Sequence, residues 1–191
     1  MSSGAAASVS LSIYPKVLIT DLDWTIWPMD VDTDVRVPFS RSGGRVIDKH
    51  GTECSLYPEI REVFKDCTAK NMLIAFASRT TDGEAAKELL LAHGLFDYLK
   101  GNRGLFQAYP SGGFGGKRRH FEAILAASGY TASDCIFFDD LNENIVGAEK
   151  MGMVSELVGS EGLNLAVYKK CIERWQEKPS SDGTSGGRPT S

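Results

Sequence analysis

The chain contains 191 residues, of which 42% are hydrophobic, 24% charged and 9% aromatic. This is the composition of a globular domain, and it excludes a fibrous, collagen-like or wholly disordered protein. Lys and Arg number 21 against 25 Asp and Glu, so the formal net charge is -4. That balance argues against nucleic acid or an anionic membrane surface as a partner.

The cysteines and the N-terminus predict a cytoplasmic location. No C-x-x-C pair occurs, so neither a zinc ribbon nor a redox motif is expected. No apolar run approaches the ~18 residues that a membrane span requires. Residues 1–13 carry no Lys or Arg that could form a signal or transit peptide. We expect a cytoplasmic monomer that does not associate with membranes.

Both ends of the chain read as tails. Residues 1–12 are rich in Ser and Ala, and residues 178–191 consist mainly of Pro, Ser, Gly and Thr. Such segments have too little apolar surface to join a core. The sequence therefore predicts disordered tails at 1–12 and 178–191, with one folded domain at 13–177.

The first half of this domain is predicted to begin with a buried parallel strand at 16–21, since an apolar run there ends in Asp21. Pro and Gly residues divide 24–56 into short pieces that suggest hairpins. Pro58, followed by apolar residues at helical spacing, predicts a helix that ends near Lys70. A second buried strand is expected at 72–77, ending at Ser78.

In the second half, strands and helices alternate. Thr81 and Glu84 have the spacing of a capping box, which predicts a helix ending at Gly94. A short third strand is expected at 96–99, and a glycine-rich loop at 101–116. The remaining expected elements are a helix at 117–128, a strand at 135–138, a helix at 145–151, a strand at 153–157 and a helix at 163–175.

This alternation predicts a three-layer α/β/α sandwich with a central parallel sheet and a β-hairpin flap after the first strand. The intervals from Asp23 to Ser78 and from Ser78 to Lys117 are taken up by the expected elements, so no cap domain is expected. In such a fold the site lies at the carboxyl ends of the strands. Asp21, Ser78 and Asp139 would all emerge there.

The residues at these strand ends point to phosphoryl chemistry. Asp21 and Asp23 alone could be turn residues, but Ser78, Lys117 and Asp139-Asp140 fall at or near other strand ends or at a helix start. Clustered carboxylates repel one another unless a cation lies among them, and oxygen ligands suit Mg²⁺. A hydroxyl and an ammonium group could then hold phosphoryl oxygens.

This ordered series of motifs resembles the haloacid dehalogenase superfamily, and within it the magnesium-dependent phosphatase-1 family. The resemblance extends over nearly the whole chain apart from its tails. The motifs that carry it are Asp21-Leu-Asp-Trp-Thr-Ile-Trp-Pro28, Leu56-Tyr-Pro58, Ala77-Ser-Arg-Thr80, Tyr109-Pro110, Lys117 with His120-Phe121, and Phe137-Phe-Asp-Asp140 with Asn144-Ile145.

The resemblance implies Asp21 as the nucleophile and Asp23 as the group that protonates the leaving group and later activates water. It implies that Ser78, Arg79 and Lys117 bind phosphate. Mg²⁺ would be held by the Asp21 carboxylate, the Asp23 backbone carbonyl and Asp139. Asp140 and Asn144 would orient water or Lys117.

Several assignments stay open at this stage. A glycine-rich insertion separates Tyr109-Pro110 from the lysine, so either Lys117 or Arg118 could occupy the lysine position. Trp24 and Trp27 could flank the substrate or belong to the core. His120, one helical turn beyond Lys117, could support the site or flank the substrate.

The expected function is that of a magnesium-dependent phosphomonoesterase that acts through an aspartyl-phosphate. The resemblance implies phosphotyrosine-type protein substrates or phosphorylated sugar adducts on proteins. A site without a cap would be open, so large substrates such as phosphoproteins are possible along with exposed sugar phosphates, and the expected partner is a phosphorylated protein or small molecule. One alternative is a phosphorylatable receiver-like signalling module without turnover, although the acidic pair comes last here rather than first. A carbon-halogen hydrolase would need neither Mg²⁺ nor Asp23, and a catalytically silent binding protein is a further alternative.

Overall fold

Five parallel strands form the central sheet, in the order β5-β4-β1-β6-β7. The computed structural model describes residues 13–111 and 116–178, so the predicted tails lie outside the described residues except for Lys178. The strands are β1 (Val17–Thr20), β2 (Ser40–Ser42), β3 (Arg45–Ile47), β4 (Leu73–Ser78), β5 (Phe106–Ala108), β6 (Cys135–Asp139) and β7 (Val154–Leu157). The helices are α1 (Ile60–Ala69), α2 (Gly83–His93), α3 (Arg118–Ser128), α4 (Asn142–Met151) and α5 (Leu165–Gln176).

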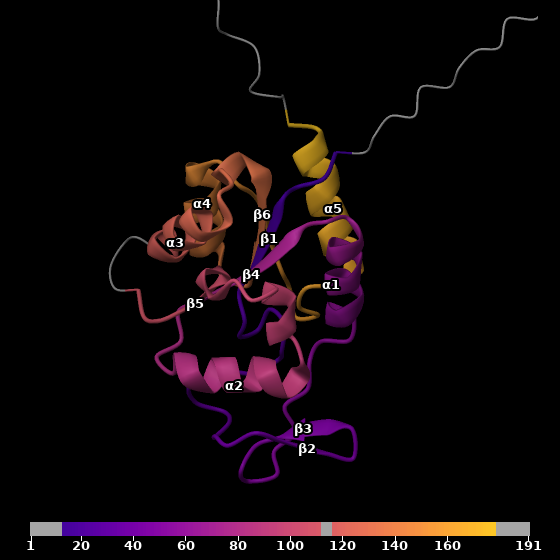
Figure 1. Ribbon diagram of the computed structural model, residues 1–191, viewed down its shortest axis with the longest axis vertical. Helices are drawn as coiled ribbons and strands as arrows, with labels where there is room; N and C mark the ends of the chain where they lie inside the picture. Colours follow the sequence, from indigo (N-terminus) through magenta and orange to yellow (C-terminus); the bar gives the residue numbers. More distant parts are fainter. Residues whose placement is uncertain (1–12, 112–115, 179–191) are drawn as a thin grey trace, which may run out of the picture.

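Helices cover both faces of this sheet, which confirms the predicted three-layer α/β/α sandwich. The helices α1 and α5 lie on one side of the strands, and α3 and α4 lie on the other (Figure 1). β1 is buried along its whole length because β4 and β6 flank it at the centre of the sheet. Among the described helices, none is long and apolar enough to cross a membrane.

Between β1 and α1 in the chain, where the sequence predicts hairpins, β2 and β3 form an antiparallel pair. Gly43 and Gly44 both have positive φ, which a tight turn between such strands requires. The pair contacts α2 through two hydrogen bonds: the Phe39 amide donates to Glu88 Oε1 (2.7 Å), and Arg41 Nε donates to the Ala92 carbonyl (2.5 Å). The hairpin therefore lies against the C-terminal half of α2 (Figure 1).

Two expectations for the middle of the chain are wrong. Residues 96–99 form a 3-10 helix instead of a strand, and the edge strand is β5, within the segment predicted to be a glycine-rich loop. β5 pairs with β4 over three residues and is only half buried, so it lacks the apolar run that marks a buried strand. Part of that loop, residues 112–115, lies outside the described residues.

The start of α2 also differs from the prediction. The N-cap is Asp82, whose side chain accepts from the Ala85 amide (2.9 Å), so the expected Thr81–Glu84 capping box does not form. The amide of Thr81 instead donates to Asp32 Oδ2 (2.9 Å), a contact from a distant part of the chain. The predicted end at Gly94 is correct, because Gly94 adopts the left-handed conformation that closes a helix.

Candidate active site

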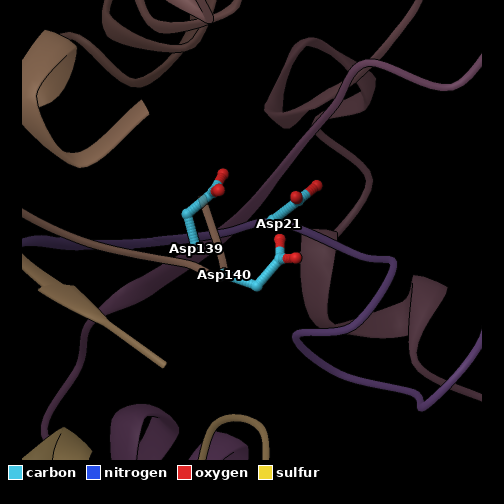
Figure 2. A group of neighbouring side chains, drawn as sticks. All are labelled: Asp21, Asp139 and Asp140. Atoms are coloured by element: carbon cyan, nitrogen blue, oxygen red, sulfur yellow. The ribbon is translucent and has the colours of Figure 1, made fainter. Parts of the chain in front are cut away.

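The carboxyl ends of the three central strands bring the predicted residues together. β1 pairs with β6 so that Thr20 lies opposite Phe138, and the Asp21 amide donates to the Phe138 carbonyl (2.9 Å). Asp21 directly follows Thr20 and Asp139 directly follows Phe138, so the two aspartates lie side by side. Figure 2 shows both carboxyl groups with that of Asp140, whose side chain points toward Asp21.

A fully buried lysine joins two of these carboxylates. Lys117 Nζ lies 2.6 Å from Asp21 Oδ1 and 2.7 Å from Asp139 Oδ2, and its side chain is 1% exposed. Burial disfavours the ammonium group, but the charges of Asp21 and Asp139 outweigh this effect and raise the pKa of Lys117. Arg118 points elsewhere and pairs with Glu122 at the surface, so Lys117 occupies the position that the sequence left open.

The two adjacent aspartates have different surroundings. Asp139 accepts hydrogen bonds on both oxygens, from Lys117, from the Leu141 amide and from Asn144 Nδ2. Asp140 forms no side-chain hydrogen bond with the residues that the structure describes, and it is half-buried. Both Asp139, the metal ligand expected from sequence, and Asp140, expected to be a supporting residue, belong to the group of carboxylates that could hold a metal ion.

The charge of this cluster suits a divalent cation. Asp21, Asp139 and Asp140 each offer a carboxylate oxygen, and these atoms lie within 4.8 Å of one another. Three carboxylates and one ammonium leave two negative charges in a buried region. Burial raises the pKa of Asp21, with the Asp139 carboxylate adding to this effect and Lys117 opposing it. All of the side-chain donors are hard oxygen ligands, so the residues present fit Mg²⁺.

Asp23 lies in the turn after Asp21 and is held by a tryptophan. Its Oδ1 accepts from Trp27 Nε1 (2.7 Å) and from the Val31 amide (3.3 Å). Burial raises the pKa of Asp23 to about 7, with the hydrogen bond from Trp27 opposing the shift. A carboxyl group with this pKa can both give and accept a proton near neutral pH.

The two tryptophans of this turn have different environments. Trp27 is fully buried, so the expectation that it could flank the substrate is not supported, and its contact with Asp23 gives it a positioning role instead. Trp24 is 45% exposed and has φ of 56°, in the left-handed region that a non-glycine residue rarely adopts. Trp24 directly follows Asp23 in the chain, and its exposure leaves it accessible to a ligand.

Ser78 ends β4 at the same edge of the sheet and is buried. Its Oγ accepts from the Thr80 amide (3.2 Å), which shapes the loop that follows. The guanidinium group of Arg79 pairs with Glu143 in the first turn of α4, so this side chain points across the site and not at the carboxylates. Because its side chain is occupied by Glu143, the backbone amide of Arg79 is the group that is left to contact phosphate.

Sequence reasoning missed Asp32, which holds this same loop. Asp32 accepts from Thr80 Oγ1 (2.5 Å) and from the amides of Thr81 (2.9 Å) and Asp82 (3.1 Å). These hydrogen bonds lower the pKa of Asp32 despite its partial burial. Asp32 lies in a turn-rich segment 48 residues before Thr80, and nothing in that spacing signals the contact.

His120 supports a neighbouring loop. Its Nε2 is 2.9 Å from the Tyr109 carbonyl, and its ring stacks on that of Tyr109 with centroids 4.2 Å apart. Because His120 is fully buried, it is placed to hold this loop and not to flank the substrate.

The chain matches known proteins over most of its length. Residues 13–178 match the family model described as Acid Phosphatase. Human Magnesium-dependent phosphatase 1 is 38% identical over 160 residues, which cover 83% of this chain and 86% of the human protein. A HAD-like hydrolase superfamily protein of Schizosaccharomyces pombe is 32% identical over 173 residues, covering 82% of this chain and 94% of that protein.

Solved structures share the fold at lower identity. A HAD hydrolase from Entamoeba histolytica has a TM-score of 0.61 at 13% identity, covering 85% of this chain and all of the other. The N-terminal part of a Bacteroides fragilis protein, containing a phosphatase domain complexed with Mg, has a TM-score of 0.57 at 21% identity. The match covers 83% of this chain and 40% of the other. The chain therefore belongs to the acid phosphatase family, within the HAD-like hydrolase superfamily.

Proposed function

We propose that this protein is a magnesium-dependent phosphomonoesterase in which Asp21 is transiently phosphorylated. The observation that carries the proposal is the buried contact of Lys117 with both Asp21 and Asp139, next to Asp23. This arrangement supplies a nucleophile and a proton donor from one turn of chain, and a fixed positive charge that Lys117 brings to them from the start of α3. The similarity to human Magnesium-dependent phosphatase 1 supports the same reaction.

The reaction would have two steps. In the first, a carboxylate oxygen of Asp21 attacks phosphorus, the bond from phosphorus to the leaving oxygen breaks, and Asp23 donates a proton to that oxygen. In the second, Asp23 accepts a proton from a water molecule that attacks phosphorus. The bond from phosphorus to Asp21 then breaks, which releases inorganic phosphate and restores the carboxylate. The pKa of Asp23, about 7, suits both proton transfers.

Asp21, Asp140 and the backbone carbonyl of Asp23 would hold Mg²⁺, with Asp140 in place of the Asp139 expected from sequence. The ion would supply positive charge that neutralises phosphoryl oxygens. Asp139 would keep Lys117 and Asn144 in position, in agreement with its hydrogen bonds. A calorimetric Mg²⁺ titration tests this exchange of roles: Asp140→Asn should weaken binding more than Asp139→Asn, and the opposite order would contradict it.

The substrate class we propose is a phosphomonoester whose leaving group is aromatic or a sugar, as in phosphotyrosine-type proteins or phosphorylated sugar adducts. The support is Trp24, whose accessible indole beside Asp23 offers a flat face for stacking. Trp24→Ala should lower kcat/KM for a phosphotyrosine peptide more than for a phosphoserine peptide. An equal loss for both peptides would contradict this role.

Hydrolysis of a generic aryl phosphate tests the activity itself. We expect turnover with Mg²⁺, none with a chelator, and none for Asp21→Asn or Asp23→Asn. Asp97→Asn is a matched control, because Asp97 is an exposed aspartate in the 3-10 helix at 96–99. Absence of turnover, together with a stable label on Asp21 from a small phosphodonor, would overturn the proposal in favour of a receiver-like module.

A further inference from the structure

A cavity of about 460 Å³ lies between the hairpin, the start of α1 and the end of α2. Its walls include Arg45 of β3, Arg61 of α1 and His93 of α2. None of the carboxylate cluster, Lys117 or Ser78 lines it, so it is separate from the candidate active site. The mechanism proposed above does not use it.

Positive charge dominates this cavity. Arg41, Arg45 and Arg61 all line it, and Glu53 is the one carboxylate among the described lining residues. Arg45 pairs with Glu53 at 3.3 Å, where both side chains are well exposed. The remaining charge is two units positive, which a dianion would balance.

Two of the guanidinium groups are already held in place. Arg41 Nε donates to the Ala92 carbonyl (2.5 Å), and Arg61 Nη2 donates to the His93 carbonyl (2.9 Å). These bonds satisfy carbonyl groups at the C-terminus of α2, which otherwise lack helical partners. Each guanidinium carries five N–H donors, so others remain for a ligand. A group fixed before binding loses less entropy when it binds.

A buried histidine, His93, also belongs to the wall of this cavity. His93 is 6% exposed, and its Nε2 has no hydrogen-bond partner among the described residues. Because this nitrogen is closed off from solvent, it is not a contact for a ligand in the cavity, and the arginine side chains are the groups that a ligand can reach. Burial lowers the pKa of His93 to about 4, with the Cys54 backbone opposing this effect and the charges of Arg61 and Arg41 adding to it.

We propose that this cavity is an anion site that binds a phosphate dianion, either free or carried as the phosphoryl group of a larger molecule. Guanidinium groups match the geometry of phosphate oxygens and bind them with paired hydrogen bonds. The apolar wall formed by Val46 and Cys54 leaves room for the group that carries the phosphoryl.

An NMR titration tests the proposal at residue level. The N–H signals of the Arg41 and Arg61 side chains are followed in the intact protein, in chelator and at constant ionic strength, while inorganic phosphate is added. We expect saturable shifts with phosphate and none that saturate with acetate. Because these signals belong to the cavity, phosphate at the catalytic cluster does not mimic the result, and Asp21→Asn should leave the shifts unchanged.

Variants give the decisive comparison. Arg41→Gln combined with Arg61→Gln should weaken phosphate binding about tenfold or more, followed through the Arg45 and His93 signals. Arg45→Gln should also weaken it, and this variant removes no contact with the backbone of α2. Glu53→Gln should tighten binding, an effect that a purely structural role would not produce. Arg103→Gln is the charge-matched control, since Arg103 is exposed and outside the cavity.

Phosphoserine and inorganic phosphate distinguish the two sources of the dianion. Tighter binding of phosphoserine would identify a carried phosphoryl group, and tighter binding of inorganic phosphate would identify the free ion. Shifts that do not saturate, or affinities that are equal in the wild type, the Arg41/Arg61 double variant and Glu53→Gln, would overturn the proposal.

Discussion

Replacing Lys117 by methionine should destabilise the protein strongly, because the lysine compensates two buried carboxylates. Its Nζ lies within 2.7 Å of both Asp21 and Asp139, and the side chains of Lys117 and Asp139 are almost fully buried. Methionine keeps much of the volume and removes the charge. Breaking a buried ion pair by deleting one partner costs about 3–5 kcal/mol, since the remaining charges lose their compensation.

Denaturant unfolding near neutral pH, in chelator, measures this loss. The difference in the free energy of unfolding between the wild type and Lys117→Met should shrink as the pH falls, because protonation of the carboxylates removes the uncompensated charge. The control is Lys65→Met, which changes an exposed lysine of α1 and should alter the free energy of unfolding by no more than about 0.5 kcal/mol. Adding Asp139→Asn to Lys117→Met should cost less than the sum of the single changes.

This reasoning would be refuted if Lys117→Met lowered the free energy of unfolding by no more than Lys65→Met does. It would mean that the two carboxylates do not depend on the ammonium group in the folded state. Full additivity of the Lys117 and Asp139 changes would contradict it as well.

Three further predictions concern other parts of the fold. Asp32→Ala should cost about 1–3 kcal/mol and raise KM, because three donors of the loop after Ser78 lose their acceptor; unchanged thermal unfolding and kinetics would contradict this. The pKa of His93 is lowered from 6.5 to about 4, so the unfolded chain takes up a proton first and stability should fall as the pH drops through this window. His93→Gln should flatten that dependence in denaturant unfolding, and an identical slope would contradict the assignment. Trp24→Gly should be more stable than Trp24→Ala by about 1 kcal/mol, because φ is 56° at this position, and equal stability would argue against backbone strain there.

The cluster of candidate site residues was predictable because parallel strands share one edge. Asp21, Ser78 and Asp139 each follow or end an apolar run, and the register of β1 with β4 and β6 brings them together. Lys117 was predicted from its place at the start of a helix, but the glycine-rich insertion before it left Arg118 as an alternative. The contacts with Asp21 and Asp139 settle that choice.

Other features depend on tertiary contacts that local patterns do not encode. The hydrogen bonds of Asp32 join segments about fifty residues apart, and Trp27 is buried because it packs within the hydrophobic core. The different surroundings of Asp139 and Asp140 arise from the start of α4, where the Leu141 amide and Asn144 both bind Asp139. The edge strand β5 is short and half-buried, so its residues resemble a loop.

Rapid-quench mass spectrometry during turnover of an aryl phosphate with Mg²⁺ tests the central claim, that Asp21 carries the phosphoryl group. In the wild type we predict a phosphoryl group on the peptide that contains Asp21, and in Asp21→Asn we predict none. Asp23→Asn should carry more of the label than the wild type where the attack of water is slowed more than the first step. Sustained hydrolysis by Asp21→Asn, or turnover with no label on that peptide in either the wild type or Asp23→Asn, would contradict the account.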